Sequence, residues 1–383
     1  MMAFADRTGL VSRRPQRRYL WTDAFAVCNF LGLSRESGEG RYEQLARALV
    51  DVVHRTLGRH RQDDPRRGWL SGLGELEGAK HPTRGGLRIG KELPERGPHE
   101  PFDPRLEWER DGQYFHYLTK WMLALDLLAR TTHEARFNLW ARELARAARE
   151  AFTYETAGSS AGRMYWKLSI DLTRPLVASM GLHDPLDGFV TCLQLQATAD
   201  ELPSEVGGPD LGEDITVFAA MARDGDWTTA DPLGLGGLLV DAYRIAQLRH
   251  RSEIARGEIA NDALLERLLA AAREGMDGYE RGAELERPAG TRLAFRELGL
   301  AIGLHAVERL WAEIEQPRVR SWVEPLFRHA PMLGRIEAFW LEPAHRAVET
   351  WSEHRDINEV MLATSLAPEG VLVLPSMRGR KNI

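Results

Sequence analysis

The chain has 383 residues, of which 43% are hydrophobic and 28% are charged, and its net charge is −6. This composition supports a buried core and excludes a disordered chain, and the 50 basic and 56 acidic residues are interspersed, unlike the basic patch of a nucleic-acid-binding protein. The two cysteines, Cys28 and Cys192, argue against a disulfide framework, a cysteine zinc site and an iron–sulfur cluster. We therefore expect a soluble globular protein from a reducing compartment.

The N-terminal segment ends in the basic run VSRRPQRR, which precedes apolar residues that begin at Tyr19. Such an order is found in secretory and twin-arginine signals, but Asp23 interrupts the apolar run and no small-residue cleavage pattern follows it. No stretch reaches the roughly 18 apolar residues of a membrane span. We therefore expect residues 1–18 to be a mobile segment, and the protein to be cytoplasmic, with neither a membrane nor a nucleic acid as partner.

Most of the remaining chain has apolar residues at helical spacing. Helices with a single apolar face are predicted to begin near Tyr42, His133 and Asp262, and helices that are apolar or glycine-rich on most faces near Tyr19, Asp111, Asp184, Asp231 and Thr291. A helix of the second kind must be covered on all sides, so the alternation predicts an outer and an inner ring of helices in an all-α fold. Strand-like alternation occurs only near residues 164–171 and 371–375.

Two inner helices begin with the same three residues, Asp-Pro-Leu, at Asp184 and at Asp231. The match is a weak internal repeat. It is equally explained by local capping, because aspartate is a good N-cap and proline is tolerated in the first turn. We therefore expect both aspartates to be N-caps.

Two connections are unusually long, residues 60–110 and 155–182, and each runs from an outer helix to an inner one. Long loops in a compact domain usually carry function. We expect them to gather on one rim, where the inner helices begin, and to form the site there.

About eleven or twelve helices in alternating roles, with long aromatic-rich loops on one rim, resemble the (α/α)6 toroid of the six-hairpin glycosidase superfamily. The barrel of the N-acylglucosamine 2-epimerase-like sugar isomerases is similar. The resemblance covers Tyr19 to Pro368, so it implies a single toroid domain over residues 19–368, followed by a C-terminal tail over residues 369–383. It also implies an enzyme that acts on a small-molecule carbohydrate.

Glycoside hydrolysis, the leading hypothesis, requires a pair of carboxyl groups, one as acid and the other as base or nucleophile. Asp111 is the first candidate, because it lies between a long loop and an inner helix, with His116 about one turn further on. Glu297 is the second, because it follows Arg296 inside an otherwise apolar helix, where an unpaired carboxylate is costly. A structural ion pair with a neighbouring arginine is the alternative for Glu297.

Polar and aromatic residues near the expected rim are candidates for contact with substrate. They are Trp21, Asp23, Gln113, Tyr165, Trp166, His183, Asp187, Arg292, Arg296 and His354. Arg292 and Arg296 lie one helical turn apart, and Gly299 and Gly303 extend their face, so we expect this face to be uncrowded and to border a pocket. The loop over residues 60–110 carries further basic residues, so an acidic sugar is favoured. Alternatively, the basic residues pair with acidic residues of the loop itself.

Two further hypotheses remain open. A sugar epimerase or isomerase needs a base beside the carbonyl, and His116, His183 and His354 are candidates. A helical binding protein without catalysis would fill the inner-helix starts with apolar side chains. No metal or phosphate-binding motif is present, so no metal or other cofactor is expected. The oligomeric state is left open.

Overall fold

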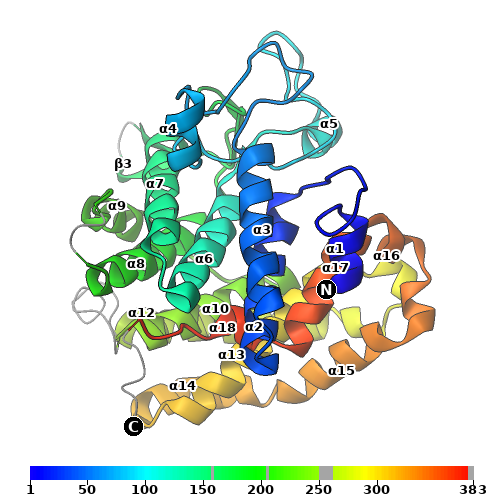
Figure 1. Cartoon of the computed structure of the whole chain (residues 1–383). Helices are drawn as coiled ribbons and strands as arrows, with labels where there is room; N and C mark the ends of the chain where they lie inside the picture. The colour runs from blue at the N-terminus through cyan, green and yellow to red at the C-terminus, as the bar shows by residue number, and fades with distance from the viewer. Residues whose placement is uncertain (157–158, 204–206, 250–261, 378–383) are drawn as a thin grey trace. The chain divides into compact units, whose positions relative to one another are not determined.

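The structure, a computed structural model, describes residues 1–156, 159–203, 207–249 and 262–377 (Figure 1). The chain forms an N-terminal unit, Met2–Asp224 with the described residues from Pro375, and a C-terminal unit, Gly225–Leu374. The single toroid domain over residues 19–368 that the resemblance implies stays a prediction.

Helices dominate the N-terminal unit. They are α1 (Met2–Arg7), α2 (Leu20–Ser37), α3 (Gly40–Leu57), α4 (Glu75–Lys80), α5 (Pro104–Glu109), α6 (Phe115–Thr132), α7 (Ala135–Phe152), α8 (Asp184–Glu201) and α9 (Gly212–Ala222). Helix α2 packs on α3 and α6, α6 packs on α7 and α8, and α8 packs on α9. The unit therefore contains three inner helices, α2, α6 and α8, each paired with an outer helix.

Burial separates the inner helices from the outer ones as the sequence predicts. In α2, every residue from Leu20 to Gly32 is buried, whereas α3 buries only one stripe, which includes Leu49, Val50 and Val53. The apolar circumference of α2 requires cover on all sides, and the charged face of α3 requires solvent.

The C-terminal unit repeats the alternation. Its helices are α10 (Pro232–Arg249), α12 (Asp262–Arg281), α13 (Ala294–Glu313), α14 (Pro317–Phe327), α15 (Ala330–Leu341), α16 (Glu349–Glu353), α17 (Arg355–Leu366) and α18 (Glu369–Leu372). Short 3-10 turns cover Glu284–Glu286, Ala289–Thr291 and Pro343–Arg346. Helix α13 packs on α10, α14, α15 and α17, and α10 packs on α12. The predicted all-α class is thus confirmed, and inner and outer helices alternate within each unit as the sequence predicts. None of the described helices combines the length and apolarity that crossing a bilayer requires.

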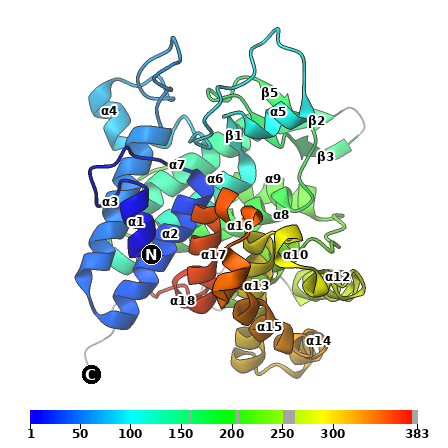
Figure 2. The ribbon, with the colours of Figure 1, turned by 90° about the vertical axis from the view of Figure 1, so that its right-hand side faces the viewer.

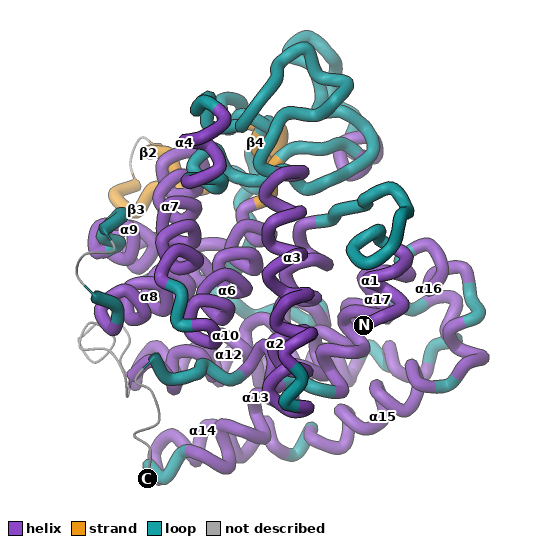
Figure 3. The backbone as a smooth tube through the Cα atoms, viewed as in Figure 1, coloured by secondary structure: helices purple, strands orange, loops and turns teal. Residues whose placement is uncertain are grey.

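The two long loops of the N-terminal unit meet at the start of α6. Strand β1 (Gln113–Tyr114) pairs with β4 (Lys167–Leu168), which pairs with β5 (Pro175–Val177), so residues from both loops share one antiparallel sheet (Figure 2). A second sheet consists of β2 (Thr153–Thr156) and β3 (Ser159–Met164). In Figure 3 these loops and strands lie together at one end of the helices of this unit. The expected rim is therefore present in the N-terminal unit.

Two local predictions differ from the structure. The strand-like segment at residues 371–375 is not a strand, because it begins inside α18 and continues as a loop. The N-terminal segment, predicted to be mobile, contains α1 with Phe4 buried, and the buried Arg18 forms an ion pair with Asp23. In both places, tertiary packing outweighs the local sequence pattern.

Helices α10 and α13 approach each other through glycines. A Cβ added at Gly236 would lie 2.0 Å from the carbonyl oxygen of Gly299, and one at Gly303 would lie 2.7 Å from the Cα of Gly236. The sequence suggests that Gly299 and Gly303 border an open pocket. That expectation is wrong, because α10 fills the space beside them.

Replacing Gly236 by alanine should lower the free energy of unfolding by about 1–3 kcal/mol, since the added methyl group overpacks this contact. Gly237→Ala is the matched control. Nothing lies within 4 Å of a Cβ at that position, so the better helix propensity of alanine should stabilise the protein by up to about 1 kcal/mol. Urea denaturation of both variants measures the difference, and equal effects would contradict the close packing.

Candidate functional site

An aromatic cluster surrounds His116 in the first turn of α6. The imidazole stacks on the rings of Tyr114 and Trp166, with centroid distances of 5.3 and 5.9 Å, and contacts the rings of Tyr117 and Trp21 edge-on. The His116 side chain is 26% exposed, so a ligand can reach it. We refer to Trp21, Tyr114, His116, Tyr117 and Trp166 as the His116 cluster.

Segments far apart in the sequence build this cluster. Trp21 comes from the first turn of α2, and Tyr114 ends β1, where it pairs with Lys167 of β4. Trp166 directly precedes β4, and its backbone N–H donates to the carbonyl oxygen of Val177 at 3.1 Å. The sheet that joins the two long loops therefore brings Tyr114 and Trp166 together beside α6.

Asp184, the first residue of α8, faces His116. The distance from Nδ1 of His116 to Oδ1 of Asp184 is 4.0 Å, and the Asp184 side chain is only 7% exposed. Burial raises the pKa of Asp184 to about 7, with the charge of Asp187 adding to the increase. Burial also lowers the pKa of His116 to about 4, with a contribution from the charge of Lys120. At neutral pH the imidazole is therefore neutral, and the carboxyl group of Asp184 gains or loses its proton in the neutral range.

Asp187 forms an ion pair one turn further along α8. Nζ of Lys120 donates to both carboxylate oxygens, at 2.9 and 2.8 Å, and the Thr119 hydroxyl donates to Oδ2 at 2.5 Å. Because α6 supplies both donors, this contact fixes the α6–α8 spacing that sets the separation of His116 and Asp184.

Two tyrosine hydroxyls adjoin the cluster. The hydroxyl oxygens of Tyr19 and Tyr117 are 2.6 Å apart, and one hydroxyl donates to the other. Burial raises the pKa of Tyr19 to about 12 and the pKa of Tyr117 well above its usual value. Both are therefore neutral at physiological pH and can donate or accept hydrogen bonds.

The structure gives Asp111 and Gln113 a full set of protein partners. Asp111 is fully buried and accepts from Arg61 at 3.2 Å, from Arg88 at 2.5 Å and from the backbone N–H of Gly90 at 3.0 Å. Gln113 is equally buried, and its side chain forms three hydrogen bonds to the backbone. Both residues hold the loop that follows α3, an arrangement that favours a structural role.

Glu297 is equally well partnered in the C-terminal unit. Arg292 donates to both carboxylate oxygens, at 2.8 and 2.6 Å, and the indole N–H of Trp340 donates to Oε2 at 2.8 Å. All three residues are buried. This arrangement favours the ion-pair alternative over catalysis. Arg296 forms its ion pair with Asp231.

The other site residues predicted from the sequence do not belong to the His116 cluster. Asp23 accepts from the backbone N–H of Tyr19 at 3.0 Å and pairs with Arg18. His183 is half-buried directly before α8. The ring of Tyr165 stacks on that of Tyr154 at 4.2 Å, and His354 is exposed beside Phe295. Of the predicted site residues, the structure thus brings together Trp21, His116 and Trp166, with Asp187 one turn beyond Asp184.

Basic residues of the long loop pair both with acidic residues of the loop itself, as the alternative from the sequence expects, and with acidic residues outside it. Arg88 pairs with Asp111, and Arg96 pairs with Glu107 at 2.9 Å. His81 and Arg84 both contact Glu143 of α7, at 2.7 and 2.9 Å. These partners neutralise the charges on which the expectation of an acidic substrate depends.

Sequence reasoning missed Asp184. Asp184 and Asp231 are each followed by Pro-Leu at the start of an inner helix. Of the two, only Asp231 acts as an N-cap, because its side chain accepts a hydrogen bond from the backbone N–H of Gly234 at 2.9 Å. The cap position of α8 is His183 instead, so the Asp184 side chain is turned to other contacts. The histidine in the first turn of the preceding inner helix is a signal that could have suggested a partner, but only folding shows which acid faces it.

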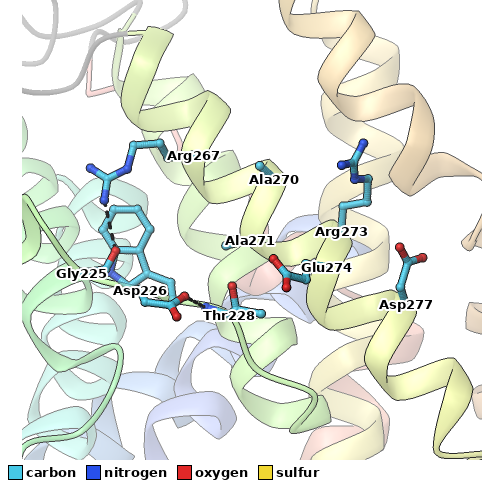
Figure 4. A pocket seen from close by; sticks show the side chains of 10 residues that line it. Gly225, Asp226, Thr228, Arg267, Ala270, Ala271, Arg273, Glu274 and Asp277 are labelled. Atoms are coloured by element: carbon cyan, nitrogen blue, oxygen red, sulfur yellow. Dashed lines mark hydrogen bonds between the residues drawn. The ribbon is translucent and has the colours of Figure 1, made fainter.

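A shallow pocket of about 500 Å³ lies in the C-terminal unit (Figure 4). It is lined by the loop over Gly225–Thr228 and by one face of α12. The indole of Trp227 is buried beneath the guanidinium of Arg267, at 4.5 Å, so its face is covered. None of the predicted site residues lines this pocket.

The described residues contain one group with possible metal ligands, Asp277, Glu280 and His329. Nδ1 of His329 lies 2.7 Å from Glu280, and Arg328 donates to Asp277 at 2.7 Å. The arginine already supplies a cation at this position.

No family model matches the sequence, and no curated protein matches it. Several solved structures are similar, including the following three. A cellobiose 2-epimerase from Spirochaeta thermophila has a TM-score of 0.46 and 12% identity, with 82% of this chain and 74% of that chain covered. A cellobiose 2-epimerase from Bacillus thermoamylovorans has a TM-score of 0.44 and 8% identity, with 82% and 76% covered. A sugar epimerase from a ruminal bacterium has a TM-score of 0.44 and 9% identity, with 82% and 75% covered. All three of these proteins are sugar epimerases.

Proposed function

We propose that this chain is a carbohydrate-active enzyme, a sugar epimerase or isomerase, with His116 as the base. One observation carries the proposal: a neutral, partly exposed imidazole lies among aromatic rings and faces a buried carboxyl group whose pKa is raised to about 7. Perturbed pairs of this kind are typical of acid–base sites.

The reaction follows from these protonation states. A ring nitrogen of His116 removes the proton from the carbon beside the carbonyl of an open-chain sugar, and the C–H electron pair moves toward the carbonyl oxygen to form an enolate. Return of a proton to the opposite face of the same carbon completes an epimerisation. Protonation of the neighbouring carbon, together with transfer of the hydroxyl proton from the C2 oxygen to the C1 oxygen, completes an isomerisation. Atoms and electrons balance without a co-reactant.

Asp184 favours this chemistry through His116. When the imidazole gains a proton, an ionised carboxylate at 4.0 Å stabilises the positive charge. Asp184 is therefore assigned as a positioning residue.

The surroundings favour a neutral sugar. Trp108 is 50% exposed and its ring packs at 4.7 Å on that of Trp166, so flat apolar surface adjoins His116, where a sugar ring can stack. The pairing of Arg88 and Arg96 with Asp111 and Glu107 removes support for an acidic substrate.

The predicted hydrolytic pair, Asp111 and Glu297, stays a prediction. The arginines that occupy both carboxylates favour the epimerase alternative.

Solvent deuterium incorporation tests the proposed function. The protein is incubated in D2O with D-glucose, D-mannose, N-acetyl-D-glucosamine and cellobiose, and NMR follows the proton at C2. We expect loss of the C2 signal from at least one sugar, together with formation of its epimer or ketose. If the protein is folded and all four sugars keep their C2 proton, the proposal is refuted. Cleavage of cellobiose would support the hydrolase instead.

The pH dependence should reflect Asp184. As pH rises through about 7, Asp184 loses its proton and begins to stabilise the imidazolium, while His116 is already neutral above about pH 4. We therefore expect kcat/KM for exchange to increase through about pH 7 and then level off. Asp184→Asn should lack this step and be slower above about pH 7, where the unmodified carboxyl group is ionised. Persistence of the step in Asp184→Asn would contradict the assignment.

A further inference from the structure

Trp21 carries a buried indole N–H group without a protein acceptor. The side chain is 6% exposed, and its Nε1 has no hydrogen-bond partner among the residues that the structure describes. Buried N–H groups nearly always have an acceptor, so an exception calls for a specific explanation, such as a ligand or a water molecule.

The indole of Trp21 packs against the rings of the His116 cluster. The indole ring lies 6.1 Å from the imidazole of His116 and 5.3 Å from the ring of Tyr117, measured between centroids. The indole ring that carries the orphan donor therefore packs beside the imidazole of the proposed base. Trp69 also has a buried indole N–H without an acceptor, but its ring lies beneath the guanidinium of Arg59, at 4.9 Å.

We propose that the indole N–H of Trp21 donates a hydrogen bond to the substrate oxygen that becomes negative when His116 removes the proton. The inference rests on the proposed function and adds the oxyanion donor to it. As the C–H bond breaks, its electron pair moves toward the carbonyl oxygen, and a neutral N–H donor stabilises the developing charge without giving up its proton.

A neutral donor suits these surroundings. The indole N–H does not titrate, and it is held by packing in the first turn of α2 against Phe25 at 5.3 Å. It is therefore preorganised before the substrate binds, which is what makes such donors effective.

Trp21→Phe tests the inference in the deuterium-exchange assay, because phenylalanine keeps an aromatic ring and lacks the N–H. We expect kcat to fall by about tenfold or more with little change in KM, since the bond strengthens as charge develops. Trp69→Phe is the matched control and should leave both constants unchanged. If the smaller ring destabilises the fold, 3-benzothienylalanine at position 21 keeps the indole shape without the N–H. Unchanged kcat in a folded position-21 variant would overturn the inference.

An NMR titration separates this inference from the proposed function. Nitrogen-15 labelling of tryptophan gives one signal for each indole N–H, and Trp21→Phe identifies that of Trp21. Addition of the same four sugars should shift the Trp21 signal and leave that of Trp69 in place. A shift without deuterium exchange would support sugar contact at Trp21 and refute the epimerase. Exchange without a shift would refute the donor and retain the epimerase, and the absence of both would refute both.

Discussion

His116→Gln should reduce the rate of C2 deuterium exchange by about 10²–10⁴-fold, the usual contribution of a general base. Glutamine is similar in size and polar, but its amide cannot accept a proton at neutral pH. Because the His116 side chain is 26% exposed, the change should leave the melting temperature close to that of the unmodified protein. The loss should appear in kcat as well as in kcat/KM, since proton removal takes place after the sugar has bound.

His183→Gln and His354→Gln are the appropriate comparisons, since the sequence makes all three histidines candidate bases. His183 is half-buried next to Asp184, whereas His354 is exposed beside Phe295 in the C-terminal unit. Full activity of His116→Gln together with a large loss in either comparison would move the base to that residue.

Glu297→Gln should lower the stability of the C-terminal unit by about 3–5 kcal/mol, because it leaves the charge of Arg292 buried without its counter-ion. The side chains of Arg292 and Glu297 are only 1% and 4% exposed, so water cannot replace the lost carboxylate. Trp340 would also lose a charged acceptor for its indole N–H. Urea denaturation followed by circular dichroism and tryptophan fluorescence measures the effect.

Glu286→Gln provides a matched control, because Glu286 also pairs with an arginine, Arg335, at 2.6 Å. In that pair both side chains are more than half exposed, so the same substitution should change stability by less than about 1 kcal/mol. If Glu297→Gln instead keeps its stability and loses activity, the carboxylate is catalytic, and the hydrolytic pair predicted from the sequence regains support.

The sequence predicts a largely buried helix near His116, and the structure contains it as α6, while the role of His116 stays a prediction. The prediction of the helix succeeds because helical periodicity and loop length are local properties of the chain. The acidic partner of His116 could not be predicted in the same way. Asp184 and Asp231 share the same local sequence, and the structure places one opposite His116 while the other caps its helix.

By itself, the sequence determined the all-α class, the alternation of inner and outer helices and the meeting of two long loops at one rim, because apolar spacing decides which faces must be buried. Only the tertiary structure decided which charges neutralise one another. Arg88 and Arg292 look available in the sequence, yet each is paired with an acid, Asp111 or Glu297. Likewise, the sequence suggests open space beside Gly303, but in the structure α10 packs against this residue. Ion pairs and helix contacts join residues that are far apart in the chain, so local sequence does not reveal them. Burial makes these contacts necessary for stability, since a buried charge without a partner is costly.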